Sequence, residues 1–372
     1  MIRISMISEG LSFILFSIAL SSFCGDSQQE QPTAYPGAKW DERTPEEVGL
    51  LRSKLDLLPD FIGGRGCIVR HGYMVYTWGD QSRCADVASA LKPWFSHFLF
   101  KAIEEGKTSS LDELVINYEP RLKDINSKLG FKDSKITWRH FANQISCYGV
   151  SEPPGTAFDY NDWQMALFGD TLFLKAYGVK WEDVDDAVLH PKLTDLIQCQ
   201  DDPTFNAFGI GERSGRFAIS VRDFARFGLL YLRKGNWNGK QIINEKYAVM
   251  AVSDPVPNSI PRTKGIEAEM IPDQRTIGSK RVPDNQGEHF GSYSWLWWLN
   301  GTDASGKRMW ADAPADTYGA FGHGGIRGMF VIPSLDIVVS YNDAENLEGW
   351  VNGSESPLNK AMKIIVEAII EK

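Results

Sequence analysis

The 372-residue sequence lacks an excess of positive charge. It carries 39 lysines and arginines against 48 aspartates and glutamates, which gives a net charge of −9 at pH 7. Domains that bind nucleic acids usually show a basic patch or stripe. The charge balance therefore argues against DNA or RNA as a partner.

Metal-binding and α/β-hydrolase motifs are also missing. There is no His-Glu-x-x-His, the six histidines are scattered, and the cysteine spacings do not match a zinc site. The Gly-x-Ser-x-Gly motif of classical α/β-hydrolases does not occur. The sequence therefore predicts neither a metal nor an organic cofactor, and it disfavours the α/β-hydrolase fold.

The N-terminal apolar stretch is too short to cross a membrane, which takes about 20 residues. Residues 11–20 form a ten-residue apolar stretch after Arg3 and before the small Ser21 and Ser22, a pattern typical of a signal peptide. We expect residues 1–24 to be this signal, residues 25–45 to be a polar linker, and the protein to be exported to the periplasm or cell envelope. Cys24 ends a loose version of a bacterial lipoprotein box, so a lipid tether on Cys24 is a second expectation.

Cysteines are few. Beyond Cys24 there are four, at positions 67, 84, 147 and 199. Four cysteines allow three complete pairings, and the sequence does not choose among Cys67, Cys84, Cys147 and Cys199.

What the sequence does contain is enough apolar material for a packed core, with 43% hydrophobic and 12% aromatic residues. Strand-like runs at 67–70 and 73–78 flank a hairpin turn, and further runs lie at 293–298, 318–322, 328–332 and 337–341 before a helix at 357–371. The middle, from about 100 to 290, is mostly helical, with a long surface loop expected at 252–290. This order predicts an α+β fold over residues 46–372, with an antiparallel sheet made from both chain ends, flanking helices and an inserted helical lobe.

A Ser-x-x-Lys motif, Ser89 to Lys92, opens one of the helices in this pattern. Residues three apart at the start of a helix lie on one face, about 5–6 Å apart. Serine needs an adjacent base to act as a nucleophile, and a desolvated lysine can be that base. The tetrapeptide alone also fits a capping serine followed by a solvated lysine, because short motifs often match by chance.

Three further motifs follow in order: Ile-Thr-Trp-Arg-His-Phe at 136–141, Pro-Gly-Thr-Ala-Phe-Asp-Tyr-Asn-Asp at 154–162, and Gly-His-Gly-Gly at 322–325. With the Ser89 motif and the helix within 211–240, they make residues 45–371 resemble the serine β-lactamase-like hydrolases, the superfamily of class C β-lactamases, DD-peptidases and related esterases. The resemblance implies the β-lactamase/transpeptidase-like fold.

The resemblance also implies site roles. Ser89 would form an acyl-enzyme, and Lys92 and Tyr160 would share the work of general base and acid, without deciding which of them deprotonates Ser89. The backbone N–H groups of Ser89 and Ile326 would form the oxyanion hole. Substrate would bind against four further residues, Asp162, His323, Gly324 and Gly325.

The sequence departs from the family pattern at several positions. Asp162 stands where the lactamases carry asparagine, and a carboxylate there would hold Lys92 charged and favour Tyr160 as the base. His323 replaces the lysine that recognises a carboxylate in lactamases, which weakens the case for β-lactam substrates. The 143–147 loop differs, and Pro93 removes one helix donor. Arg327 beside the cleft would either meet an acidic substrate group or be a solvated surface arginine, and we expect the second.

These observations predict an exported serine hydrolase that cleaves a small-molecule ester or amide, or a peptide. Two alternatives stay open: a β-lactamase or DD-peptidase acting on peptidoglycan-like substrates, and a non-catalytic envelope binding or sensing module of the same fold. The sequence predicts no oligomeric state.

Overall fold

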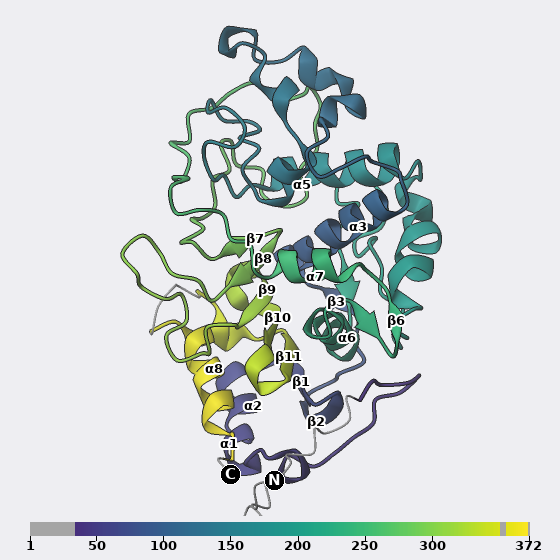
Figure 1. Cartoon of the computed structure of the whole chain (residues 1–372), viewed down its shortest axis with the longest axis vertical. Coiled ribbons are helices and arrows are strands. Elements are labelled where there is room, and N and C mark those ends of the chain that lie inside the picture. The colour runs from purple at the N-terminus through teal and green to yellow at the C-terminus, as the bar shows by residue number, and fades with distance from the viewer. Residues whose placement is uncertain (1–33, 350–354, 371–372) are drawn as a thin grey trace, which may run out of the picture. The chain divides into compact units, whose positions relative to one another are not determined.

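The computed structural model describes residues 34–349 and 355–370 (Figure 1). The expected signal peptide and Cys24 lie outside these residues. Of the expected linker, residues 34–45 are described, and they lie along the domain: Tyr35 packs edge-on against Trp237, and Trp40 Nε1 donates to the Arg222 carbonyl at 3.1 Å. Among the described residues, no helix is both long enough and apolar enough to span a bilayer.

The core of the domain is a seven-stranded antiparallel sheet in the order β2-β1-β11-β10-β9-β8-β7. Its strands are β1 (Arg65–Arg70), β2 (Tyr73–Trp78), β7 (Tyr293–Ser294), β8 (Trp297–Leu299), β9 (Tyr318–Gly322), β10 (Arg327–Ile332) and β11 (Ile337–Asn342). Strand β1 from the N-terminal part pairs with β11 from the C-terminal part, so the predicted sheet built from both chain ends is confirmed.

One strand prediction is wrong. Residues 293–298 were expected to form a single strand, but they form β7, a turn and the start of β8. The turn residues Trp295 and Leu296 have φ of 44° and 72°, values in the left-handed region that suits tight hairpins. The aromatic run hid this turn because neither residue is a usual turn former.

Helices cover the sheet on two sides (Figure 1). Helix α8 (Pro357–Glu367) lies beside α1 (Arg52–Leu55) and α2 (Leu58–Ile62), across the sheet from α6 (Val221–Leu232). Helix α6 begins at Ser220, whose Oγ accepts from the Asp223 N–H at 3.2 Å. Gly228 lets α6 approach the sheet, because a Cβ there would lie 2.6 Å from Val338 Cγ1.

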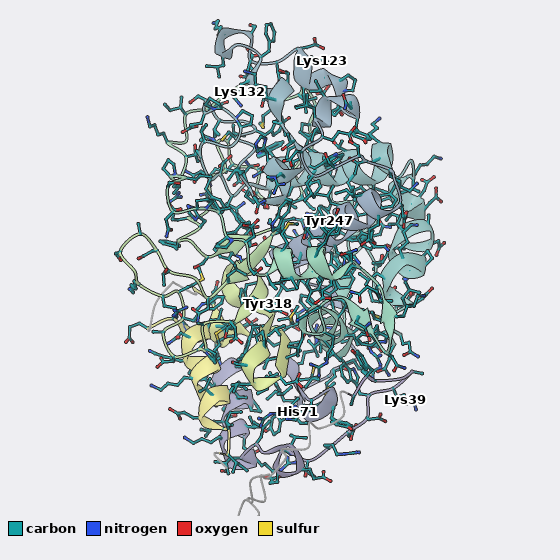
Figure 2. The ribbon with its side chains drawn as sticks, in the orientation of Figure 1. Lys39, His71, Lys123, Lys132, Tyr247 and Tyr318 are labelled. Carbon is teal, nitrogen blue, oxygen red and sulfur yellow. The ribbon has the colours of Figure 1, made fainter. Side chains whose placement is uncertain are left out.

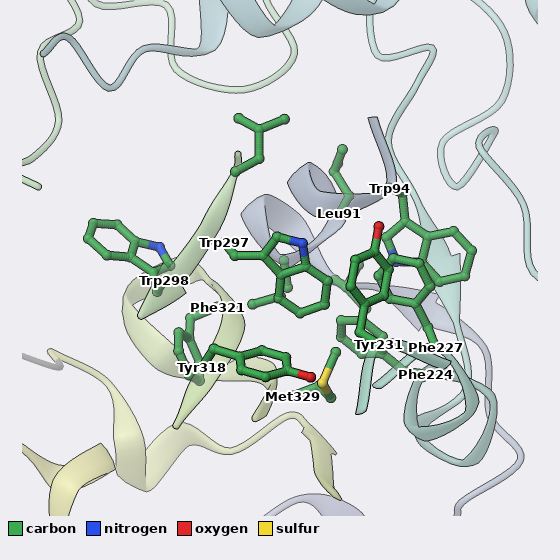
Figure 3. Close-up of a cluster of buried hydrophobic side chains, with 14 of the residues drawn as sticks. Leu91, Trp94, Phe224, Phe227, Tyr231, Trp297, Trp298, Tyr318, Phe321 and Met329 are labelled. Carbon is green, nitrogen blue, oxygen red and sulfur yellow. The ribbon is translucent and has the colours of Figure 1, made fainter. Parts of the chain in front are cut away.

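The space between α6, helix α3 (Lys92–Glu104) and the sheet is filled by stacked rings (Figure 3). Phe227 stacks on Trp94 at 4.1 Å between ring centroids and on Trp297 at 5.6 Å, and Tyr231 contacts Trp297 at 4.6 Å. Large rings bury much apolar area each. This aromatic layer fixes α3, and therefore its first residue, Lys92, against the sheet.

The middle of the chain contains α4 (Trp138–Ala142), α5 (Asp162–Gly169), α7 (Glu245–Ala251), π-helical turns at Asp170–Ala176 and Asp185–Thr194, and two small ribbons, β3 (Ala85–Asp86) with β4 (Ala218–Ile219) and β5 (Asn236–Trp237) with β6 (Lys240–Gln241). Short 3₁₀ turns lie at Glu46–Val48, Ala88–Leu91, Val115–Asn117, Pro120–Lys123, Ser127–Leu129, Lys132–Lys135, Trp181–Asp183, His323–Gly325, Pro333–Leu335 and Glu345–Leu347. Lys132, labelled in Figure 2, forms a buried ion pair with Asp133 at 3.0 Å. The predicted helical insert is therefore present.

Candidate active site

Ser89 lies in the 3₁₀ turn Ala88–Leu91 that leads into α3. The preceding Ala88 has a φ of 51°, an unusual value for a residue with a side chain. The end of β9 presses on this turn: a Cβ at Gly322 would lie 2.3 Å from the Val87 oxygen and 2.8 Å from the Ser89 nitrogen. Only glycine fits at the end of this strand, and the end of β9 therefore holds the Ser89 turn in place.

Lys92, the first residue of α3, is buried beside Ser89 with 3% of its surface exposed. Its Nζ donates to Ser89 Oγ at 2.8 Å and to Asp162 Oδ1 at 3.2 Å. It also lies 4.4 Å from the centroid of the Tyr160 ring. Three groups from two predicted motifs are thus gathered around the Lys92 amino group.

Both members of the Lys92–Asp162 pair are held in their charged forms. Burial works against the Lys92 charge, but Tyr160 and Asp162 outweigh it and raise the pKa of Lys92. Burial likewise works against the Asp162 charge, but Lys92 and the Ser279 N–H outweigh it and lower the pKa of Asp162. Lys92 is therefore an ammonium at neutral pH.

Asp162 is clamped by the segment 276–286. The Ser279 N–H donates to Asp162 Oδ2 at 2.9 Å, and Asp284 Oδ2 accepts from the Asp162 N–H at 2.8 Å. The Gln286 N–H donates to the Tyr160 carbonyl at 2.9 Å. The predicted long loop at 252–290 is present, and part of it builds the site. These contacts use mostly backbone groups, which leave no signal in a sequence.

Tyr160 is supported by an aromatic wall from the β7–β8 hairpin. Its ring stacks on Trp298 with centroids 6.0 Å apart and meets Tyr293 edge-on at 5.8 Å. The side chain keeps only a small exposed fraction of 7%. The phenol is thereby restricted to the space beside Lys92.

A cavity of about 830 Å³ opens onto these groups. Its lining includes six of the predicted residues: Ser89, Lys92, Tyr160, Asp162, His323 and Gly324. It does not include Gly325 or Ile326. The Ile326 N–H donates to the His323 carbonyl at 3.3 Å within a tight turn, so the expected second oxyanion donor is already engaged.

Arg327 differs from the solvated arginine expected from the sequence. It pairs with Asp86, which also receives Arg216 through two bonds, Nε to Oδ1 at 2.9 Å and Nη2 to Oδ2 at 2.5 Å. The Asp86 carboxylate thus forms ion pairs with two guanidinium groups next to the cavity.

The four cysteines within the described residues are unpaired thiols. Cys67 and Cys147 are buried, and Cys84 donates to the Asp201 carbonyl at 2.6 Å. In the same part of the chain, no group of three or more His, Cys, Asp or Glu side chains could hold a metal ion.

A second buried carboxyl, Asp159, predicts a pH dependence of stability. Burial raises its pKa to about 7, and its Oδ1 has no hydrogen-bond partner among the described residues. A raised carboxyl pKa costs stability as pH rises from about 4 to about 7, since the unfolded chain gives up the proton first. We expect Asp159→Asn to stabilise the protein at pH 8 by up to about 4 kcal/mol relative to its effect at pH 4, measured by urea unfolding. An equal effect at both pH values would contradict this assignment.

No family model and no curated protein matches this sequence. Solved structures do match. A β-lactamase from Mycobacterium bovis is 16% identical with a TM-score of 0.55, and the alignment covers 84% of this chain and 97% of that one. A β-lactamase/D-alanine carboxypeptidase from Pseudomonas syringae is 12% identical with a TM-score of 0.53, covering 87% and 98%. A penicillin-binding protein homologue from Caulobacter crescentus is 12% identical with a TM-score of 0.54, covering 88% and 98%.

The chain has the β-lactamase-like fold. The fold predicted from the Ser89 motif and its companions is therefore confirmed. At these identities the likeness concerns the backbone alone. The chemistry of this β-lactamase-like chain has to be argued from its own residues.

Proposed function

We propose that this protein is a serine hydrolase that cleaves an ester or amide through an acyl-enzyme on Ser89. The observation that carries the proposal is the contact of 2.8 Å between Lys92 Nζ and Ser89 Oγ at the wall of the cavity. A capping serine with a solvated lysine would not bury the lysine, yet Lys92 is 3% exposed. A buried lysine beside a serine in a cleft is a typical arrangement for an activated nucleophile.

In this mechanism Ser89 Oγ attacks the carbonyl carbon of the substrate. Because Asp162 holds Lys92 as an ammonium, Lys92 has no lone pair with which to accept the Ser89 proton. Tyr160, whose ring centroid lies 4.4 Å from that ammonium, takes the proton and passes it to the leaving group. Lys92 stabilises negative charge on the side-chain oxygens of Ser89 and Tyr160. The Ser89 N–H faces the developing oxyanion of the substrate.

Water then attacks the acyl-enzyme ester, with Tyr160 again accepting the proton and Ser89 Oγ leaving. The sequence alone left open whether Lys92 or Tyr160 is the base. The ion pair with Asp162, at 3.2 Å, supports Tyr160. Asp162 is a positioning residue in this scheme because it acts through Lys92.

Labelling with a fluorophosphonate probe tests the nucleophile. We expect one adduct, located on Ser89 by peptide mapping, that is absent in Ser89→Ala. Ser96→Ala is the matched control, since Ser96 lies on the same helix but bonds the Pro93 carbonyl at 2.9 Å and does not line the cavity. A wild-type protein that stays unlabelled beside a reactive control hydrolase would favour the non-catalytic binding or sensing module.

Turnover rates distinguish an esterase from a β-lactamase or DD-peptidase. Short-chain esters should be cleaved faster than a chromogenic cephalosporin, because His323 stands at the position of the lysine that recognises a substrate carboxylate in lactamases. Comparable rates would favour a β-lactamase or DD-peptidase.

We further propose that the protein is exported to the cell envelope, because of the apolar stretch at 11–20, and that it is tethered there through a lipid on Cys24. We expect the protein to incorporate radiolabelled palmitate and Cys24→Ala to lose this incorporation.

A further inference from the structure

Two arginines meet on one ring at the cavity. The guanidinium carbons of Arg213 and Arg216 lie 4.9 Å and 5.4 Å from the centroid of the Phe208 ring, and both arginines line the cavity. Phe208 itself is 50% exposed. Stacking on one ring holds two like charges close together, at an electrostatic cost that an anion between them would relieve.

The acids nearby do not neutralise this pair. Asp86 pairs with Arg216, but it also pairs with Arg327, and no ion pair of Arg213 occurs among the described residues. The neighbouring acids are engaged elsewhere: Asp170 with Arg275 at 2.5 Å and Glu212 with Lys280 at 3.5 Å. Two guanidinium groups, those of Arg216 and Arg327, therefore share the single carboxylate of Asp86, and Arg213 has no carboxylate partner among the described residues.

The cavity as a whole has the same bias. Its lining contains five cationic side chains, namely Lys92, Arg213, Arg216, Lys307 and Arg308. It contains three anionic side chains, namely Asp162, Glu288 and Asp303. The whole protein carries a charge of −9. A cleft whose sign opposes that of its protein focuses an attractive field on ligands of the other sign. Here that field favours anions.

We propose that the substrate is an ester or amide that also bears a carboxylate, and that Arg213 and Arg216 bind this carboxylate while Ser89 attacks the carbonyl. The inference rests on the proposed function, since it names the substrate class of the same site. Arg216 is fixed by Asp86 and by the Ile277 carbonyl, to which its Nη1 donates at 3.3 Å. Arg213 is exposed and has its donors available at the rim. Arginine suits the role because its planar fork matches a carboxylate.

Matched esters test the proposal. The neutral probes are 4-nitrophenyl hexanoate and phenyl hexanoate. Their acidic counterparts are the mono-4-nitrophenyl ester of adipic acid, with the charge on the acyl side, and 4-carboxyphenyl hexanoate, with the charge on the leaving group. We expect one of the acidic esters to have a higher kcat/KM than its neutral counterpart. Arg213→Gln should lower kcat/KM for that acidic ester about tenfold, mainly by raising KM. For the neutral esters, kcat/KM should stay within twofold of the wild-type value. Added salt should lower kcat/KM for the acidic ester only, because it screens the attraction between the arginines and the carboxylate.

Lys128→Gln is the control, because it removes the same charge from an exposed lysine that lies outside the cavity lining and has no ion pair among the described residues. It should leave the acidic preference unchanged. An equal fall for acidic and neutral esters in Arg213→Gln, or an unchanged preference, would overturn the proposal while leaving the serine hydrolase intact.

Binding separates this proposal from the catalytic one. In Ser89→Ala, calorimetry should show that the monomethyl ester of adipic acid binds more tightly than methyl hexanoate, and that adding Arg213→Gln removes the difference. This readout needs no turnover. If wild-type protein cleaves no ester but this difference is present, the proposed catalysis fails and acidic recognition stands; equal affinities would overturn the recognition.

Discussion

Lys92→Met should lower kcat/KM for a short-chain ester about 10³-fold and the free energy of unfolding at pH 7.5 by about 3–5 kcal/mol. The substitution removes the ammonium that contacts Ser89 Oγ and leaves Asp162 buried without its charged partner. In the wild type, the lowered pKa of Asp162 contributes stability above about pH 4, and this contribution is lost as pH falls. In the variant, burial without Lys92 raises the Asp162 pKa, so stability falls as pH rises.

The stability gap between wild type and Lys92→Met should therefore widen from pH 4 to pH 7.5, measured by urea unfolding at each pH. Adding Asp162→Asn should recover part of the stability and none of the activity. Lys132→Met is the matched control, because Lys132 and Asp133 form another buried lysine–aspartate pair with side chains 4% and 0% exposed, away from the cavity lining. It should lose comparable stability and keep its kcat. Activity of Lys92→Met within tenfold of wild type would remove Lys92 from the mechanism.

Gly322→Ala should reduce kcat/KM about 10²-fold or more, although it adds only one methyl group. The backbone at Gly322 is extended, with φ −136° and ψ 153°, so alanine suffers no conformational penalty there. Its Cβ would instead lie 2.3 Å from the Val87 oxygen and 2.8 Å from the Ser89 nitrogen, and the Ser89 turn would have to move. A displacement of about 1 Å at a reacting group can cost about 10²-fold in rate. Overpacking should also cost about 1–3 kcal/mol of stability, measured by thermal or urea unfolding.

The control for this prediction is Gly66→Ala on β1. A Cβ at Gly66 would lie 2.3 Å from Trp78 Cζ2 and 2.7 Å from the Ser340 oxygen, which is as crowded but lies away from the cavity lining. It should cost similar stability and leave the kcat of the folded protein unchanged. If both glycine variants lose activity in proportion to stability, Gly322 has no special bearing on Ser89.

The sequence allowed the fold and the central groups of the site to be predicted because both depend on side chains. The apolar runs of β1, β10 and β11 predict buried strands, and Ser89, Lys92, Tyr160 and Asp162 occur in motifs with recognisable spacing. The structure gathers these four residues at one cavity.

Features that depend on backbone groups could not be predicted. Ser279 holds Asp162 through its N–H, which almost any residue could supply, so nothing in its side chain marks the role. The expected donor at Ile326 is engaged because His323, Gly324 and Gly325 all take positive φ values, of 50°, 64° and 97°, and close a turn. A histidine in the left-handed region is uncommon, and the motif does not reveal it. The arginine pair on Phe208 is also invisible in the sequence, since its meaning comes from sharing Asp86 with Arg327.

The pairing of β1 with β11 delays completion of the central sheet until the C-terminal part of the chain has been synthesised. Arg65 pairs with Asn342, about 280 residues later in the chain. At about 5–20 residues per second, a ribosome needs about 15–55 s to produce the partner of β1 once β1 has been made. Gly322 is itself made only about 20 residues before Asn342, so for most of this time it cannot contact the Ser89 turn. The catalytic site therefore assembles only after nearly the whole chain has been synthesised.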